Sequence, residues 1–203
     1  MEKFLILGGG TAALNAAKAI RERNRTASII MISEEKELPY DRPMLTKNMF
    51  GALSGDSIAS EDRAWFDDNN IVLKLDTKVE KLDTAKKEAT LSDGDVLSYD
   101  KCIYALGSYS FVPPIKGREL EGVTAVRTIS DVEKITQWAL NAKSAVVIGG
   151  GVLGLEAAWE LRKEKLQVTV LEGAPVLMAG RIDSEAVEML TKIADDQGVR
   201  IIT

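Results

Sequence analysis

Two glycine-rich motifs carry the clearest chemistry in the sequence. Each follows a short apolar run and precedes a helical pattern. They are Gly8-x-Gly10-x-x-Ala13 and Gly149-x-Gly151-x-x-Gly154. In a strand–turn–helix unit the first glycine makes a tight turn, the second lets a pyrophosphate approach the backbone, and the third small residue lets the helix pack on the strand. One such motif could be a plain glycine-rich turn, but two matched copies favour two dinucleotide sites at helix starts, where unpaired amides and the helix dipole attract a diphosphate.

An acidic residue follows the second apolar run of each copy. Glu34 comes after residues 28–32, and Glu172 comes after residues 168–171. A carboxylate there can accept hydrogen bonds from both hydroxyls of a ribose. Each acid could instead be a solvated residue at a strand end, and Glu35 could replace Glu34 if its strand ends one residue later. In the second copy the carboxylate would repel a 2′-phosphate, so we expect NADH to be preferred to NADPH.

The elements that must position these residues occur in the same order in both copies. In the first copy the pattern predicts strands over residues 4–7 and 28–32 and a helix over 11–23. In the second copy it predicts strands over residues 145–148 and 168–171 and a helix over 152–164. The sequence is therefore expected to contain two βαβ units of one design.

Further elements surround the two copies. Strands are predicted over residues 71–75, 78–82, 88–91, 96–98, 101–105 and 199–202, and helices over residues 60–70, from a Ser130/Glu133 capping box to about Leu140, and over 183–197. Asp93-Gly94 is typical of a hairpin turn, which favours a small antiparallel β-meander.

The predicted fold class is α/β, with two Rossmann-like domains of three layers. The extended segment Phe111-Val112-Pro113-Pro114 is the best boundary, so the domains are expected to span residues 1–112 and 113–203. The second domain has only three or four predicted strands by Thr203, fewer than a six-stranded Rossmann sheet needs. We therefore expect it to be incomplete.

Composition excludes several other kinds of chemistry. The 203 residues include no histidine, which excludes Ser-His and Cys-His catalysis and histidine-ligated metal, and no metal site is expected. The net charge of −5 argues against nucleic-acid and membrane-surface partners. The N-terminus lacks the apolar core of a signal peptide, so a cytoplasmic location is expected. The single cysteine, Cys102, lies in an apolar run and is interpreted as an inert core residue.

Three segments resemble one family, the pyridine nucleotide–disulfide oxidoreductase superfamily, in its branch of rubredoxin reductases, ferredoxin reductases and nitrite reductase flavin domains. Residues 38–47, LPYDRPMLTK, resemble the PYxRPxLSK segment of that branch. Residues 99–107, YDKCIYALG, resemble its ATG strand, although Leu106 stands where threonine is usual. Residues 149–156, GGGVLGLE, resemble its GGGxxGxE motif. The resemblance covers the whole chain but only about the first half of a family enzyme.

The resemblance implies FAD at the first glycine motif and NADH at the second. It places Arg42, Pro43 and Lys47 near the flavin and implies that Lys47 pairs with Glu156 beside the ring, which makes these two the candidate catalytic residues. The alternative is that Lys47 caps an exposed short helix and Glu156 lies on a solvated helix face. The expected cofactor-binding residues are Gly8, Gly10, Thr11, Ala13, Glu34, Arg42, Pro43, Lys47, Val79, Ala105, Gly107, Gly149, Gly151, Val152, Leu153, Gly154 and Glu172.

The departures from the family decide between possible electron acceptors. Family branches that use a redox cysteine carry it in the stretch equivalent to residues 38–50, where this chain has none. Electrons are therefore expected to pass from NADH through FAD to a small redox protein such as rubredoxin or ferredoxin, or to a fused metal centre, in a protein that could be a homodimer. Two alternatives stay open: an oxidase that uses oxygen or a small acceptor, and a truncated dinucleotide-binding module without turnover. No segment equivalent to the family's later Gly-Asp strand, which holds the flavin's ribityl chain, is expected within residues 1–203.

Overall fold

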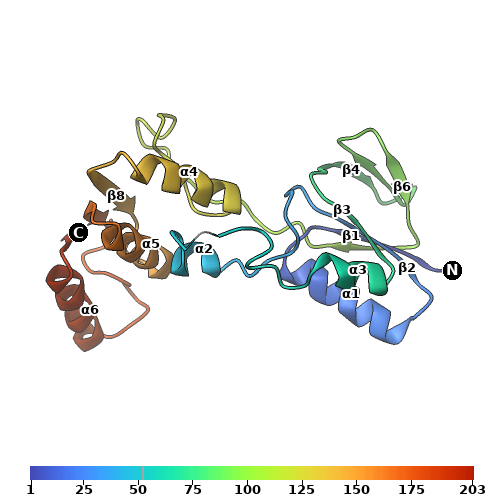
Figure 1. The fold of residues 1–203 in the computed structure, drawn as a ribbon, viewed down its shortest axis with the longest axis horizontal. Coiled ribbons are helices and arrows are strands. Elements are labelled where there is room, and N and C mark those ends of the chain that lie inside the picture. Colours follow the sequence, from blue (N-terminus) through green and yellow to red (C-terminus); the bar gives the residue numbers. More distant parts are fainter. Residues whose placement is uncertain (52) are drawn as a thin grey trace. The chain divides into compact units, whose positions relative to one another are not determined.

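The computed structural model describes residues 1–51 and 53–203, and these residues form two compact units. The first unit contains Met1–Asp41 and Ser54–Tyr109, and the second contains Arg42–Leu53 and Ser110–Thr203. Figure 1 shows the elements of both units coloured along the sequence. The boundary near residue 110 is close to the predicted one at 112. The segment 42–53 also groups with the second unit, so the first unit is not one continuous stretch of the chain.

The first unit is built on a four-stranded parallel sheet with the order β3-β2-β1-β7. Its strands are β1 (Lys3–Leu7), β2 (Ser28–Ile32), β3 (Ile71–Lys74) and β7 (Lys101–Tyr104). Both faces of this sheet are covered, because Ile6 packs with helix residues such as Leu14, while its neighbours Leu5 and Leu7 pack with Ala89 of the meander. A strand buried on both faces explains the unbroken apolar run of β1.

Helices and a meander supply the two covering layers of the first unit. The helices are α1 (Thr11–Arg23) and α3 (Arg63–Asp68), and the antiparallel meander comprises β4 (Val79–Asp83), β5 (Glu88–Leu91) and β6 (Val96–Ser98). Phe66 of α3 is fully buried in the same core cluster as α1. Helix α3 is shorter than the predicted helix over residues 60–70. It begins after Asp62, whose side chain caps the helix by accepting a hydrogen bond from Trp65 N at 2.8 Å.

The second unit contains a three-stranded parallel sheet with the order β10-β9-β8. Its strands are β8 (Ser144–Ile148), β9 (Gln167–Leu171) and β10 (Val199–Ile202), and its helices are α2 (Met44–Lys47), α4 (Ile129–Ala139), α5 (Val152–Lys163) and α6 (Ser184–Asp196). Ala158 and Leu161 of α5 bury one face of the sheet with Val168 and Val170. On the opposite face Val146 and Ile148 are exposed.

The start of α4 differs from the prediction. The capping box is formed by Thr128 and Asp131, each of whose side chains bonds to the backbone of the other, and not by Ser130 and Glu133. A helix that begins at Ile129 buries both Ile129 and Val132 in the unit. The packing of these two residues explains why the earlier box is used.

Candidate functional site

The first glycine turn is wedged between two strands of its sheet. Gly8 N donates to Ile32 O at 2.8 Å, and Ala105 N donates to Leu7 O at 2.8 Å. Gly8 has a φ of +126°, and a Cβ at this position would lie 2.0 Å from Ala105 O. Both the backbone conformation and the close approach of the Ala105 carbonyl therefore require glycine.

Beside this turn, the start of α1 faces open space. Gly10 is the N-cap, and nothing lies within 4 Å of where its Cβ would be. The first amide bonded within the helix is that of Leu14, which donates to Gly10 O at 3.0 Å, so the amides before it have no acceptor in the helix. Thr11 is exposed at this helix start, and Ala13 is fully buried beneath it. This arrangement of donors and free space fits a pyrophosphate.

The second turn has the same backbone hydrogen bond and the same open helix start as the first, but Gly154 stands where the first turn has Ala13. Gly149 N donates to Leu171 O at 2.8 Å, and the N-cap Gly151 again has nothing within 4 Å of a built Cβ. A Cβ on Gly154 would lie 2.0 Å from Gly149 O, so the helix can pack this closely only with glycine there. Val152 and Leu153 are exposed in the first turn of α5. The second helix start therefore also fits a pyrophosphate.

The acids at the two turns are not equivalent. In register, Leu7 pairs with Ile32 as Ile148 pairs with Leu171, so Ser33 and Glu172 are the residues that directly follow the paired strands. A Cβ on Gly9 would meet the Ser33 hydroxyl at 2.3 Å, just as one on Gly150 would meet the Glu172 carboxylate at 3.1 Å. The two copies of the motif, compared by sequence, paired Glu34 with Glu172. In the structure the counterpart of Glu172 is Ser33, one residue earlier.

The two acidic residues that follow Ser33, Glu34 and Glu35, differ in their contacts. Glu35 accepts a hydrogen bond from the Tyr40 hydroxyl at 2.6 Å, whereas Glu34 is exposed. The side chain of Glu34 is therefore accessible to a ligand, and its role with ribose remains a prediction.

Glu172 is held by two backbone amides. Its carboxylate accepts from Gly150 N at 2.6 Å and from Ala174 N at 2.8 Å. The amides of Ala174 and then Gly150 lower the pKa of Glu172 from its ordinary value of 4.5. Because the folded-state pKa is depressed, the contribution of these bonds to stability is fully present above pH 4.5 and is lost as pH falls through the lowered pKa. The Glu172 side chain therefore carries a negative charge at neutral pH.

We expect Glu172→Ser to narrow the preference for NADH over NADPH. A unit charge about 4 Å from another is worth on the order of 4 kcal/mol at an effective dielectric near 20, so removing the carboxylate should improve NADPH affinity by at least about tenfold. Calorimetric titration of both nucleotides into the wild type and the variant measures this. Glu164→Ser, at the opposite end of α5, is the control. Equal affinity of the wild type for both nucleotides would contradict the assignment.

The predicted ion pair between Lys47 and Glu156 is not formed among the residues that the structure describes, and this expectation is corrected. Thr46 Oγ1 donates to Glu156 Oε2 at 2.6 Å instead, and Lys47 is exposed. Successive side chains of a helix point about 100° apart, so only one of these neighbours can face α5 from α2. That neighbour is Thr46, which is buried.

Four other predicted residues lie in four different settings. Arg42 donates to the carbonyl oxygen of Arg127, just before the cap of α4, and Pro43 is the exposed N-cap of α2. Val79 begins β4 and packs partly into the core under the meander. Gly107 is exposed beyond β7 with a φ of +76°. The roles of these four residues in cofactor binding stay predictions.

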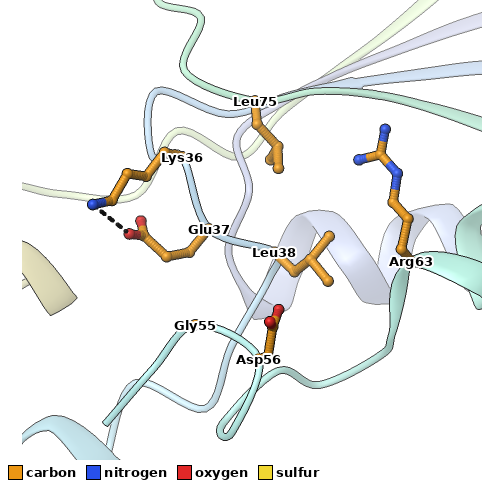
Figure 2. A pocket seen from close by; sticks show the side chains of 7 residues that line it. All are labelled: Lys36, Glu37, Leu38, Gly55, Asp56, Arg63 and Leu75. Carbon is orange, nitrogen blue, oxygen red and sulfur yellow. Dashed lines mark ion pairs between the residues drawn. The ribbon is translucent and has the colours of Figure 1, made fainter.

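The first unit also contains an open cavity of about 450 Å³, which the sequence did not predict. Figure 2 shows Leu38 and Leu75 in it, with Arg63 reaching in from the start of α3 and Lys36 paired with Glu37 at 3.5 Å. Gly55 and Asp56 complete its lining. The charged residues of this lining are of the kind found in any solvated loop, so the sequence alone does not indicate that they line a cavity.

Comparison with known proteins adds to this geometry. A family model described as pyridine nucleotide-disulphide oxidoreductase matches residues 2–203. The ferredoxin–NAD(+) reductase component of the anthranilate 1,2-dioxygenase system of Burkholderia cepacia is 35% identical over 203 residues, which cover 98% of this chain and 49% of the relative. The large subunit of nitrite reductase (NAD(P)H) of Klebsiella oxytoca is 36% identical over 183 residues, which cover 90% of this chain and 19% of the relative.

A solved structure agrees with these sequence relatives. The ferredoxin reductase for the CYP199A2 system of Rhodopseudomonas palustris matches 100% of this chain and 50% of its own, with a TM-score of 0.93 and 28% identity. The chain thus spans about half the length of the two ferredoxin reductases and less of the nitrite reductase. No helix in the described part of the chain is long and apolar enough to cross a membrane.

Proposed function

Because the chain belongs to the pyridine nucleotide-disulphide oxidoreductase family, we propose that it binds FAD at the first glycine turn and NADH at the second, as part of an NADH-dependent oxidoreductase. The observation that carries this proposal is the repeated geometry of the two turns. Each has an N-capping glycine, Gly10 or Gly151, beside open space at the carboxyl end of a parallel sheet. Such sheet edges are where dinucleotides bind in α/β folds.

The residues around each turn would hold the two cofactors. When bound, the nicotinamide would supply hydride chemistry, and the flavin would allow the two electrons to be released one at a time. The amides at the starts of α1 and α5 would hold the pyrophosphates, and Glu34 and Glu172 would accept hydrogen bonds from ribose hydroxyls. Lys47 would supply positive charge near the flavin, where it favours the reduced anion. Its exposed position on α2 leaves its ammonium group accessible.

We further propose a small redox protein or a fused metal centre as the electron acceptor. The Burkholderia cepacia relative is named as a ferredoxin–NAD(+) reductase component, which supports this acceptor class. A thiol route is disfavoured, since Cys102 lies half-buried in β7 against the meander core and burial raises the pKa of its thiol. A thiol with a raised pKa is a poor nucleophile and redox group at neutral pH.

Anaerobic addition of NADH to the FAD-reconstituted protein tests the proposal. Bleaching of the yellow flavin is the expected result, and stopped-flow reoxidation by ferredoxin, rubredoxin or air then separates a redox-protein reductase from an oxidase. A preparation that binds neither FAD nor NADH would overturn the proposal. Binding of both without bleaching would indicate a dinucleotide-binding module without turnover.

Replacing Lys47 by methionine should slow flavin reduction by NADH about tenfold, because the reduced flavin would lose a stabilising positive charge. Single-turnover stopped-flow absorbance measures the rate at saturating NADH. Lys116→Met, which removes an exposed lysine from the segment between β7 and α4, is the matched control and should leave the rate unchanged. An unchanged rate in Lys47→Met would remove Lys47 from the mechanism.

A further inference from the structure

We propose that Thr46 is a positioning residue that acts through Glu156. In this proposal, which rests on the proposed function, their hydrogen bond holds the segment 42–53 on the second unit and thereby places Lys47. The segment comes from the first half of the sequence, directly after the loop that carries Glu34, yet it groups with the unit that contains the second glycine turn.

The hydrogen bond between Thr46 and Glu156 has the properties of a strong anchor. The Thr46 hydroxyl donates to Glu156 Oε2 at 2.6 Å, and Thr46 is only 4% exposed. A hydroxyl that donates to a carboxylate makes a charge-assisted bond, which is about twice as strong as a neutral one. Glu156 lies on α5, the helix whose N-terminus forms the second glycine turn. The bond therefore ties α2 to the helix that would hold NADH.

Two further contacts tie the same segment to the second unit. Arg42 donates to the carbonyl oxygen of Arg127, whose own N–H donates to Asp131 Oδ2 at 3.0 Å within the capping box of α4. At the other end of the segment, Phe50 packs against the core of the second unit. Thr46 lies between these two anchors and is the one beside Lys47.

Helix geometry gives Thr46 and Lys47 different environments on α2. Thr46 faces α5 and is used for attachment, while Lys47 points elsewhere and is exposed. Loss of the Thr46 hydroxyl would leave Lys47 chemically intact but less firmly held. Thr46→Val removes the donor at nearly the same volume, whereas Thr46→Ser keeps it, and Glu156→Gln keeps an oxygen acceptor while removing the charge.

Hydrogen exchange in the 203-residue chain tests the attachment without any cofactor. In Thr46→Val the amides of Asn48 and Gly51, which donate to Met44 O and Asn48 O, should exchange about tenfold faster, while those of β8 and β9 remain unchanged. Thr46→Ser should match the wild type, and Glu156→Gln should keep most of the protection. Unchanged exchange at Asn48 and Gly51 in Thr46→Val would overturn the proposal, as would an equal increase throughout the second unit.

Stopped-flow reduction of the FAD-loaded protein tests the consequence for Lys47. Thr46→Val should slow reduction by NADH about tenfold at saturating NADH, with unchanged FAD and NADH affinities and unchanged reduction by dithionite, and Thr46→Ser should restore the rate. If the wild type bleaches and Thr46→Val bleaches equally fast, the positioning role is wrong and the proposed function stands. If the wild type does not bleach, the proposed function fails, and the exchange experiment still decides the attachment.

Discussion

Replacing Gly8 by alanine should lower the free energy of unfolding by about 3 kcal/mol or more, the largest loss of stability that we expect from a single methyl group in this chain. The φ of +126° is unfavourable for any residue with a Cβ, and the added carbon would lie 2.0 Å from Ala105 O. Since that oxygen belongs to the backbone beyond β7, relief would require the strand end to shift away from β1. Urea unfolding followed by circular dichroism measures the change.

Gly94→Ala is the matched control for Gly8→Ala. Gly94 also has a positive φ, +90°, but nothing lies within 4 Å of a built Cβ in its hairpin turn between β5 and β6. Its replacement should therefore cost only the conformational strain, about 1 kcal/mol. Equal losses for the two variants would show that contact with Ala105 does not make the first turn tight.

Replacing Gly151 by valine should weaken NADH binding about a hundredfold and change the free energy of unfolding by less than about 1 kcal/mol. The N-cap backbone at Gly151, with a φ of −85°, is accessible to any residue, and the space beyond it is open. The new side chain would fill the space where the pyrophosphate is expected to approach. Calorimetric titration with NADH, together with an unfolding curve, measures both quantities.

Gly10→Val makes the reciprocal control at the first turn. It should weaken FAD binding by a similar factor and leave NADH affinity unchanged, because each helix start is proposed to serve one cofactor. If Gly151→Val lowered the affinity for FAD rather than NADH, the assignment of the two turns would be reversed. If neither variant altered either affinity, the glycine turns would have no role in binding.

The fold was predictable wherever the sequence pattern reports burial directly. The apolar runs of β1 and β8 and the glycines after them required strand, turn and helix in both copies, and the structure confirms these elements. The meander was also predictable, since Asp93-Gly94 marks its hairpin turn. These features depend on local chemistry and on periodicity, which a sequence displays.

The details of the site depend on side-chain direction, which spacing alone does not give. The family resemblance implied that Lys47 pairs with Glu156, whereas in the structure the partner of Glu156 is Thr46. A four-residue helix offers no periodicity from which its buried face could be predicted. The alignment of Glu34 with Glu172 failed for a related reason. Strand register, and not residue type, makes Ser33 the counterpart of Glu172.

Nuclear magnetic resonance titration of the isotope-labelled chain would show whether each helix start binds a different dinucleotide. FAD should shift the backbone amide resonances of residues 10–13, and NADH should shift those of residues 151–154, each with little effect on the other set. If saturating concentrations of both cofactors left both sets of resonances unmoved, neither helix start would be a dinucleotide site.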